Sequence, residues 1–334
     1  MNKPRGLRYI SDQLLVWKRL KKGKYFRYVN KLGNPLSPED RERVESLVIP
    51  PAWRNVRLSP SHNGHILAVG FDVKGRKQYI YHPQWVAYNQ QHKFESLKKF
   101  GEILPTLRET VAGHMRQHDL SRDRILATVV WLLEHTFIRV GNKTYAKENQ
   151  SYGLTTMRTK HVDVKGQSVR FSFKGKSSVY HELAISHPRV AATIKECIEL
   201  PGYELFKYLD EDDYWWPIDS ADVNEYLKII TGESFSAKDF RTWGGTTLAG
   251  DKLFQLGKLE DDLTLEKAVS QVVQEVSEHL GNTPAVCRQY YIHPKVIDSY
   301  QQGQLPTHFA QVYRVPSKIP SGLTKEEYAT LSLL

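Results

Sequence analysis

Short runs of alternating polar and apolar residues dominate the first part of the chain, up to about residue 88. Residues 24–29 alternate in this way, and turn-forming residues follow at 33–35. Two further runs, at 65–72 and 76–82, flank a turn-forming stretch, an arrangement that predicts an antiparallel hairpin. The pattern therefore predicts a strand-rich beginning to the chain.

The period of the pattern changes near residue 92. From there to about residue 140, apolar residues recur at helical spacing with few turn-forming residues between them. At 334 residues the chain is also longer than one compact core usually supports. We therefore predict an α+β protein with two domains. These are a strand-rich domain over residues 1–88 and a mainly α-helical domain with a small β-hairpin over residues 89–334.

Two helices have well-defined ends in the sequence. One is predicted over residues 122–140, with Ser121 as its N-cap and Gly141 ending it. The other is predicted over residues 265–280, with valines on its core side and Gly281 at its end. The chain after about residue 300 is too irregular for any element to be predicted.

Composition and charge narrow the class of protein. The formal net charge of +10 concentrates polyanions near the surface, which favours nucleic acid as a partner. The only cysteines, Cys197 and Cys287, are far apart, which argues against a disulfide framework or a cysteine-based zinc site and indicates a reducing cytosol. No run approaches ~18 apolar residues, and the start lacks the apolar core of a secretory signal. We expect a cytoplasmic protein with no membrane partner.

Three stretches resemble sites that the sequence does not support. Residues 70–77 look like the opening of a phosphate loop, but they join two predicted strands and lack the required Lys-Ser/Thr pair. His114 and His118 have the spacing of a zinc pair without the glutamate that should follow His114. The acidic run at 210–213 has no histidine partner. We therefore expect neither ATP, nor a metal, nor any other cofactor.

Five residues in distinct contexts together provide what attack on a phosphodiester requires. Singly, Arg139 could serve a helix end, Lys176 a solvated turn beyond the 161–173 hairpin, and Arg241 a surface helix. Arginine meets two phosphoryl oxygens at once and keeps its proton, whereas lysine can protonate a leaving oxygen when nearby cations lower its pKa. Asn282 adds a neutral hydrogen-bond donor, and Tyr291 a hydroxyl nucleophile.

These residues stand in blocks that resemble, in the same order, the type IB DNA topoisomerases, most closely their small poxvirus-like and bacterial branch. The resemblance extends over roughly residues 7–300. The blocks are 137–142 (Phe-Ile-Arg-Val-Gly-Asn), 171–176 (Phe-Ser-Phe-Lys-Gly-Lys), 237–243 (Ala-Lys-Asp-Phe-Arg-Thr-Trp) and 291–294 (Tyr-Ile-His-Pro), with weaker matches at 49–53 and 75–79.

The resemblance implies a role for each residue. Tyr291 would be the nucleophile, forming a 3′-phosphotyrosyl bond and releasing a 5′-hydroxyl; Tyr290 is its rival, but Tyr291 opens the matching block and follows Asn282 at the family's interval. Arg139 and Arg241 would hold the phosphoryl oxygens. Lys176 would be the general acid, with Lys238 assisting. Asn282 departs from the histidine of many family members, so it can contact a phosphoryl oxygen but cannot pass a proton.

The resemblance also implies contacts with double-stranded DNA outside the catalytic set. Gln78, Tyr79 and Tyr81 match positions where the family's N-terminal domain touches DNA, and Tyr145 matches a position that contacts phosphate. Alternation along a strand would place Tyr79 and Tyr81 on one face. Equally, the two tyrosines could belong to the core.

We therefore expect an enzyme that relaxes supercoiled DNA without ATP or metal, by cleaving one strand, letting it rotate and religating it. A monomer closing as a clamp on DNA, in a bacterial cytosol, is the family expectation. Two alternatives are a tyrosine site-specific recombinase, which shares this chemistry but usually carries histidine where this chain has Lys238, and a basic DNA-binding protein without catalysis.

Overall fold

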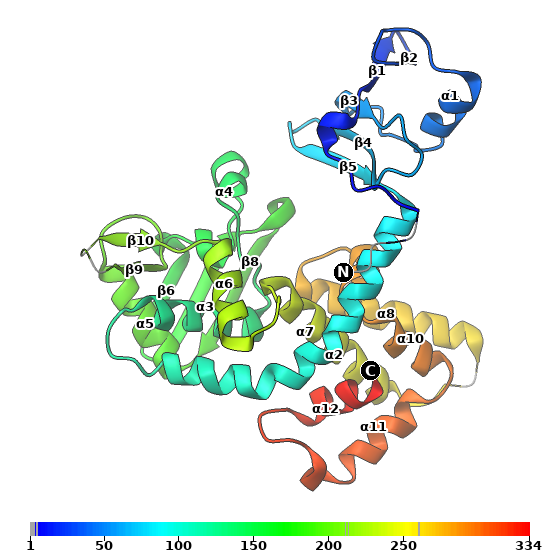
Figure 1. Ribbon diagram of the computed structural model, residues 1–334. Helices are drawn as coiled ribbons and strands as arrows, with labels where there is room; N and C mark the ends of the chain where they lie inside the picture. Colours follow the sequence, from blue (N-terminus) through cyan, green and yellow to red (C-terminus); the bar gives the residue numbers. More distant parts are fainter. Residues whose placement is uncertain (1–3, 5, 211, 213, 260) are drawn as a thin grey trace. The chain divides into compact units, whose positions relative to one another are not determined.

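The computed structural model describes residue 4 and residues 6–210, 212, 214–259 and 261–334, and for residues 262 and 263 only the backbone. The chain divides into two compact units, Met1–Phe94 and Glu95–Leu334, both visible in Figure 1. Each unit contains five of the described strands, while most of the helices lie in the second unit, so the protein belongs to the α+β class, as predicted.

The first unit is built on an antiparallel sheet with the strand order β2-β1-β3-β4-β5. The predicted hairpin is present, because β4 pairs with β5 from Ile66–Tyr81 to Phe71–Lys77. Helix α1 packs on one face of the sheet through Val44, which joins a core with Val56, Leu58 and Ala68. The elements are η1 (Asp12–Leu14), β1 (Trp17–Lys22), β2 (Tyr25–Val29), α1 (Pro38–Glu45), β3 (Arg54–Leu58), β4 (Ile66–Phe71) and β5 (Lys77–Tyr81).

The second unit is mainly helical. Helix α2 (Pro83–His114) begins in the first unit and continues into the second. The elements that follow it are α3 (Arg122–Thr136), α4 (Lys143–Asn149), η2 (Leu154–Thr156), η3 (Thr159–His161), β6 (Val162–Lys165), β7 (Ser168–Lys174), η4 (Lys176–Ser178), β8 (Tyr180–Ser186), α5 (Pro188–Glu199), β9 (Lys207–Leu209), β10 (Trp215–Pro217), α6 (Ser220–Thr231), α7 (Ala237–Leu256), α8 (Asp262–Leu280), α9 (Pro284–Tyr290), α10 (Pro294–Gln301), α11 (Leu305–Tyr313), η5 (Pro316–Lys318) and α12 (Lys325–Leu333). No helix in the described ranges is long and apolar enough to cross a membrane.

A three-stranded antiparallel sheet, β6-β7-β8, replaces the small hairpin that the sequence predicts. Strands β6 and β7 form that hairpin, with Val162 opposite Phe171. The additional strand, β8, pairs along the whole of β7 and places His181 opposite Phe173. Lys176 therefore lies in the turn between two paired strands.

The end of α3 differs from the prediction. The N-cap is Ser121, as predicted, and its hydroxyl accepts a hydrogen bond from the Arg124 amide (3.3 Å). However, the helix ends at Thr136 and not at residue 140, because Phe137 adopts the left-handed conformation (φ 52°). That conformation is costly for a bulky residue without tertiary support. Arg139 consequently lies in the segment beyond the helix.

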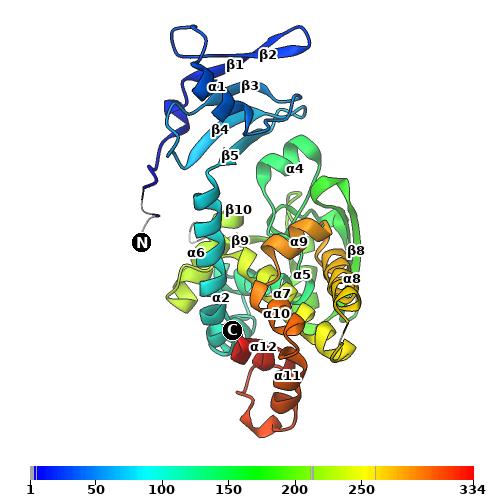
Figure 2. The ribbon, with the colours of Figure 1, turned by 90° about the vertical axis from the view of Figure 1, so that its right-hand side faces the viewer.

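Helix α7 supplies the support that holds Phe137 in this conformation. A Cβ atom placed on Gly244 would lie 2.0 Å from Cε1 of Phe137, so only glycine allows the ring to rest on the helix there. Figure 2 shows α7 grouped with α8, α9 and α10, and α7 contacts both α8 and α10. The chain after residue 300, for which no element could be predicted, forms α11 and α12, which also pack on α7.

Replacing Gly244 by alanine should therefore destabilise the protein. We expect Gly244→Ala to lower the free energy of unfolding in urea by about 1–3 kcal/mol, because its methyl group overpacks the Phe137 ring. The matched control is Gly113→Ala in α2, where an added Cβ meets nothing within 4 Å. That change should raise stability by roughly 0.5–1 kcal/mol. A Gly244→Ala protein as stable as the wild type would contradict the packing described here.

Candidate active site

Arg139 is directed at the connection between α8 and α9. Its Nη2 donates to the carbonyl oxygen of Gly281 (2.8 Å) and to Oδ1 of Asn282. The segment carrying Arg139 is fixed by backbone hydrogen bonds, since its carbonyl oxygen accepts from the Leu154 amide (2.9 Å). Because α3 ends at Thr136, Arg139 lies in a loop from which it contacts Gly281, 142 residues later in the sequence.

Arg241 reaches the same place from the first turns of α7. It is buried, although the sequence also allowed a surface arginine. Its Nη2 donates to the carbonyl oxygen of Leu280 (2.6 Å), and its Nη1 donates to that of Phe137. The guanidinium carbon lies 5.2 Å from the centre of the Tyr291 ring, a cation–π distance. Arg241 therefore links the end of α8 to the proposed nucleophile.

Both arginines are bound at the C-terminus of α8, and this explains how two like charges can lie together. Carbonyl groups at a helix C-terminus carry partial negative charge, which stabilises cations there. The stabilisation is incomplete: burial, and then the charge of Arg241, lowers the pKa of Arg139 to about 10. Burial also lowers the pKa of Arg241. Both guanidinium groups stay charged at neutral pH, at a free-energy cost that a bound anion would reduce.

Two buried N–H donors at this site have no acceptor among the described residues. One is Nδ2 of Asn282, whose Oδ1 already accepts from Arg139; the other is Nε of Arg241. Buried donors without partners are rare because desolvation costs about 1–3 kcal/mol each. Their position beside two cations fits an oxyanion that arrives with a ligand.

Helix α7 also fixes the backbone of Tyr291. The Thr246 hydroxyl donates to the Tyr291 carbonyl oxygen (3.3 Å) and accepts from the His293 amide (3.0 Å). A Cβ on Gly245 would lie 2.7 Å from the same carbonyl oxygen, so the two backbones are in direct contact. Tyr291 is half-buried at the end of α9, whereas Tyr290 is exposed on the outside of that helix. The arrangement favours Tyr291 over its neighbour.

The two lysines that the sequence predicts as catalytic, Lys176 and Lys238, are exposed and have no side-chain hydrogen bond or ion pair to the arginines within the described ranges. Lys176 is exposed in the turn between β7 and β8, and no hydrogen bond or ion pair joins it to the arginines in the part of the chain described. Lys238 is exposed in the first turn of α7, one turn before Arg241. The structure therefore brings together Arg139, Arg241, Asn282 and Tyr291, and leaves both lysines outside the cluster.

The aromatic residues predicted to contact DNA are exposed. Tyr79 and Tyr81 stack on one face of β5 with their ring centres 5.7 Å apart, and Lys77 lies 5.4 Å above the Tyr79 ring. Gln78 points to the opposite face, where its amide donates to Asp72 (3.1 Å). Tyr145 is exposed on α4 in the second unit. The two stacked tyrosines are thus not core residues.

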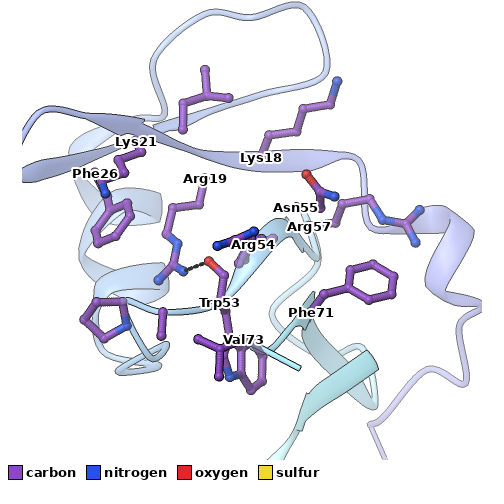
Figure 3. Close-up of a pocket in the computed structure, with 14 residues that line it drawn as sticks. Lys18, Arg19, Lys21, Phe26, Trp53, Arg54, Asn55, Arg57, Phe71 and Val73 are labelled. Carbon is purple, nitrogen blue, oxygen red and sulfur yellow. Dashed lines mark hydrogen bonds between the residues drawn. The ribbon is translucent and has the colours of Figure 1, made fainter. Parts of the chain in front are cut away.

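A hollow of about 880 Å³ opens elsewhere on the first unit. Figure 3 shows that its wall carries Lys18, Lys21, Arg54 and Arg57. At its base the buried guanidinium of Arg19 donates to the Trp53 carbonyl oxygen (2.9 Å), the bond drawn in the figure. The hollow is therefore strongly cationic.

Sequence reasoning missed two residues that contact the cluster, Thr246 and His181. Thr246 carries no recognisable signal, because a buried helical threonine usually bonds only its own helix. The strand that carries His181 could have been found, because Leu183 and Ile185 alternate with Glu182 and Ser186 in the sequence, a pattern that predicts a strand.

The described parts of the stretches set aside in the sequence make ordinary structural contacts. His114 is hydrogen-bonded to the Tyr226 hydroxyl (2.8 Å). The turn within residues 70–77 joins two strands, as expected. Of the acidic run 210–213, residues 211 and 213 lie outside the described part of the chain. Among the residues that are described, no group of three or more His, Cys, Asp or Glu side chains could hold a metal ion.

Comparison with known proteins assigns the family. Residues 77–314 match the family model of the eukaryotic DNA topoisomerase I catalytic core, and residues 25–72 match that of the bacterial DNA topoisomerase IB N-terminal domain. DNA topoisomerase 1B of Acanthamoeba polyphaga mimivirus is 29% identical over 285 residues, covering 83% of this chain and 85% of that protein. DNA topoisomerase 1B of Vaccinia virus (strain Copenhagen) is 22% identical over 239 residues, covering 70% and 72%. The chain belongs to the type IB DNA topoisomerases.

The Thr246 hydroxyl can be tested against its neighbour on α7. Thr246→Val removes both hydrogen bonds to the segment at Tyr291, so we expect the free energy of unfolding to fall by about 1–3 kcal/mol and DNA relaxation to slow. The buried Thr247 hydroxyl has no hydrogen-bond partner among the described residues, so Thr247→Val is an isosteric control that should preserve or raise stability. Equal effects of the two changes in urea unfolding and relaxation assays would count against this role for Thr246.

Proposed function

We propose that this chain relaxes supercoiled DNA by cutting and resealing one strand through a covalent bond to Tyr291, without ATP or metal. The observation that carries the proposal is that two guanidinium groups and the unpaired amide nitrogen of Asn282 lie beside the half-buried Tyr291. This set attracts a phosphate and places an oxygen nucleophile next to it. Family membership supports the same reaction class.

In the cleavage step the Tyr291 hydroxyl oxygen attacks the phosphorus. The bond from this oxygen to phosphorus forms while the bond from phosphorus to the 5′-oxygen breaks, leaving a 3′-phosphotyrosine and a free 5′-hydroxyl. The phenolic proton passes to solvent, and the 5′-oxygen takes up another. The guanidinium of Arg241 lies 5.2 Å from the ring centre, so a phosphate bound to it lies next to the attacking oxygen.

Stabilising the charge of the five-coordinate transition state falls to Arg139, Arg241 and Asn282. Preorganised donors at a developing oxyanion usually supply the largest contribution to catalysis. Arg139 holds the Asn282 amide by its oxygen, so the nitrogen is presented as a donor. The buried Nε of Arg241 is a second donor available to a phosphoryl oxygen.

Protonation of the leaving 5′-oxygen falls to Lys176, with Lys238 assisting. Lys176 lies on the turn at the end of β7 that leads into β8, and its side chain is exposed there. Such an acid contributes roughly 10²–10⁴-fold to the rate. Religation is the reverse displacement, so the phosphotyrosine conserves the energy of the broken bond and nothing else is consumed.

Between the two displacements, torque in the supercoiled DNA turns the free 5′ end about the intact strand. The first unit, residues 1–88 in the proposed division, acts as a DNA clamp. Its exposed Tyr79 and Tyr81 and the neighbouring Lys77 form a basic, aromatic surface suited to a duplex. Tyr145 adds a contact to the same duplex, and one copy of the chain suffices. Gln78 contacts the duplex only if its amide leaves Asp72 on the opposite face of β5.

The decisive test is relaxation of a plasmid by the wild type, Tyr291→Phe and Tyr290→Phe proteins, with EDTA present and ATP absent. We expect the wild type to remove both positive and negative supercoils, since strand rotation follows either torque. Tyr291→Phe should lose relaxation and also the covalent protein–DNA adduct seen after denaturation. Tyr290→Phe should retain both. Full activity of Tyr291→Phe, or a wild type that binds DNA but never relaxes it, would refute the proposal.

The role of Lys176 is tested with a substrate whose leaving group needs no acid. We expect Lys176→Ala to slow cleavage of an ordinary duplex by roughly 10²–10⁴-fold. A duplex with sulfur in place of the bridging 5′-oxygen should restore much of that rate, because a thiolate leaves without a proton. Arg139→Ala should stay slow on both substrates. If Lys176→Ala were equally slow on the two duplexes, Lys176 would not be the acid.

A further inference from the structure

A histidine that the proposed reaction does not use lies between the turn carrying Lys176 and the loop carrying Asn282. His181 is half-buried on β8, where its ring stacks on Phe173 of β7 with the ring centres 5.2 Å apart. The stacking fixes the plane of the imidazole on the face of the sheet that is turned toward the cluster.

On one side the imidazole rests against the backbone just before Lys176. A Cβ atom on Gly175 would lie 2.5 Å from Cδ2 and 2.6 Å from Nε2 of His181, closer than real side-chain contacts allow. The turn itself is strained, because Ser177 and Ser178 both have positive φ angles (61° and 65°). A strained, exposed turn needs support from a neighbouring group to keep one conformation, and the His181 ring is in direct contact with it.

The ring also contacts the connection that follows α8, through its Cε1 atom. A Cβ atom on Gly281 would lie 2.8 Å from Cε1 of His181 and 3.8 Å from Nη1 of Arg139. Gly281 precedes Asn282, and its carbonyl oxygen accepts from Arg139. The ring thus fills the space between two segments that are over 100 residues apart in sequence.

Burial and nearby charge both favour the neutral form of the His181 ring. Burial, and then the charges of Arg139 and Arg241, lower the pKa of the imidazole below its usual value. A neutral ring adds no third positive charge beside the two arginines, so it can pack there without repelling them.

Resting on the function proposed above, we propose that His181 is a positioning residue that aligns the Lys176 turn with the phosphate-binding loop at Gly281 and Asn282. The imidazole acts as a spacer of fixed thickness between these two segments. Its contribution is to place the Lys176 ammonium group at the 5′-oxygen when the phosphate is held by Arg139 and Asn282. Without it the turn has other conformations, and the acid is misplaced while the phosphate contacts remain.

The test compares single-turnover cleavage of the ordinary duplex and of the 5′-bridging sulfur duplex. We expect His181→Ala to slow cleavage of the ordinary duplex on the order of 10- to 100-fold, the effect of a misplaced catalytic group. The sulfur duplex should be cleaved at close to the wild-type rate, and the DNA concentration at half-maximal rate should change little. A merely structural loss would slow both substrates alike.

His187 provides a matched control. It is also a partly buried histidine of the second unit, but its Nδ1 caps α5 by accepting from the Val190 amide (3.2 Å). His187→Ala should lower thermal stability and leave the ratio of the two cleavage rates at its wild-type value. The same change of ratio in His187→Ala would overturn the proposal, as would a His181→Ala protein with the wild-type ratio.

Gly175→Ala approaches the contact from its other side and keeps the proposal testable if His181→Ala does not fold. Gly175 has a negative φ angle (−94°), so alanine is tolerated by the backbone, but its methyl group must displace the imidazole. We expect the same selective slowing of the ordinary duplex. In the double variant the methyl group has room, so the two effects should not add; fully additive effects would contradict a shared contact.

Failure of this inference can be told apart from failure of the proposed function. If Lys176→Ala regains its rate on the sulfur duplex while His181→Ala does not change the ratio, only the role of His181 is wrong. If Lys176→Ala is equally slow on the two duplexes, the proposed role of Lys176 fails first and the inference falls with it.

Discussion

The candidate active site depends on the carbonyl groups that end α8. Leu280 and Gly281 accept from Arg241 and Arg139 and hold two cations close together before any phosphate is present. Partial negative charge at a helix C-terminus offsets part of their mutual repulsion. The offset is partial, because burial and then the charge of Arg241 still lower the pKa of Arg139. The site therefore carries excess positive potential that a phosphodiester can neutralise.

Helix α7 fixes the positions of the groups around this cluster. In about two turns it presents the Arg241 guanidinium, a glycine against which Phe137 rests, and the Thr246 hydroxyl that holds the Tyr291 backbone. Helix α7 thus holds the backbone at Phe137, at Leu280 and at Tyr291 in fixed positions. Rigid helical placement holds reacting groups more accurately than placement on loops does, and the loop residues Arg139 and Asn282 are held by hydrogen bonds to the end of α8 and to each other.

The parts of the fold that could be predicted are those whose ends carry a local signal. Gly281, with a φ angle of 58°, ends α8 where the sequence indicates, and the β4–β5 hairpin forms around its turn residues. The end of α3 was predicted four residues too late, because the conformation of Phe137 is imposed by packing on α7 and not by its neighbours in sequence. Tertiary support of this kind leaves no trace in a single sequence.

The same distinction applies to the site. The types of residue at 139, 241, 282 and 291 could be chosen from the chemistry of phosphodiester cleavage and the family resemblance, and the structure places these four together. That Arg241 is buried, that Thr246 bonds the segment at Tyr291, and that His181 fills the space behind the Lys176 turn depend on contacts between distant elements. No periodicity or spacing encodes those contacts.

The double role of the Asn282 side chain limits which residues could replace it during evolution. Its oxygen is occupied by Arg139, and its nitrogen is left for a second acceptor. A substitute must therefore offer one acceptor and one donor within the length of a short side chain. A carboxylate has no donor, a hydroxyl has less reach, and an aliphatic group has neither. A neutral imidazole has both, so histidine is the residue that could take the place of asparagine here on physical grounds.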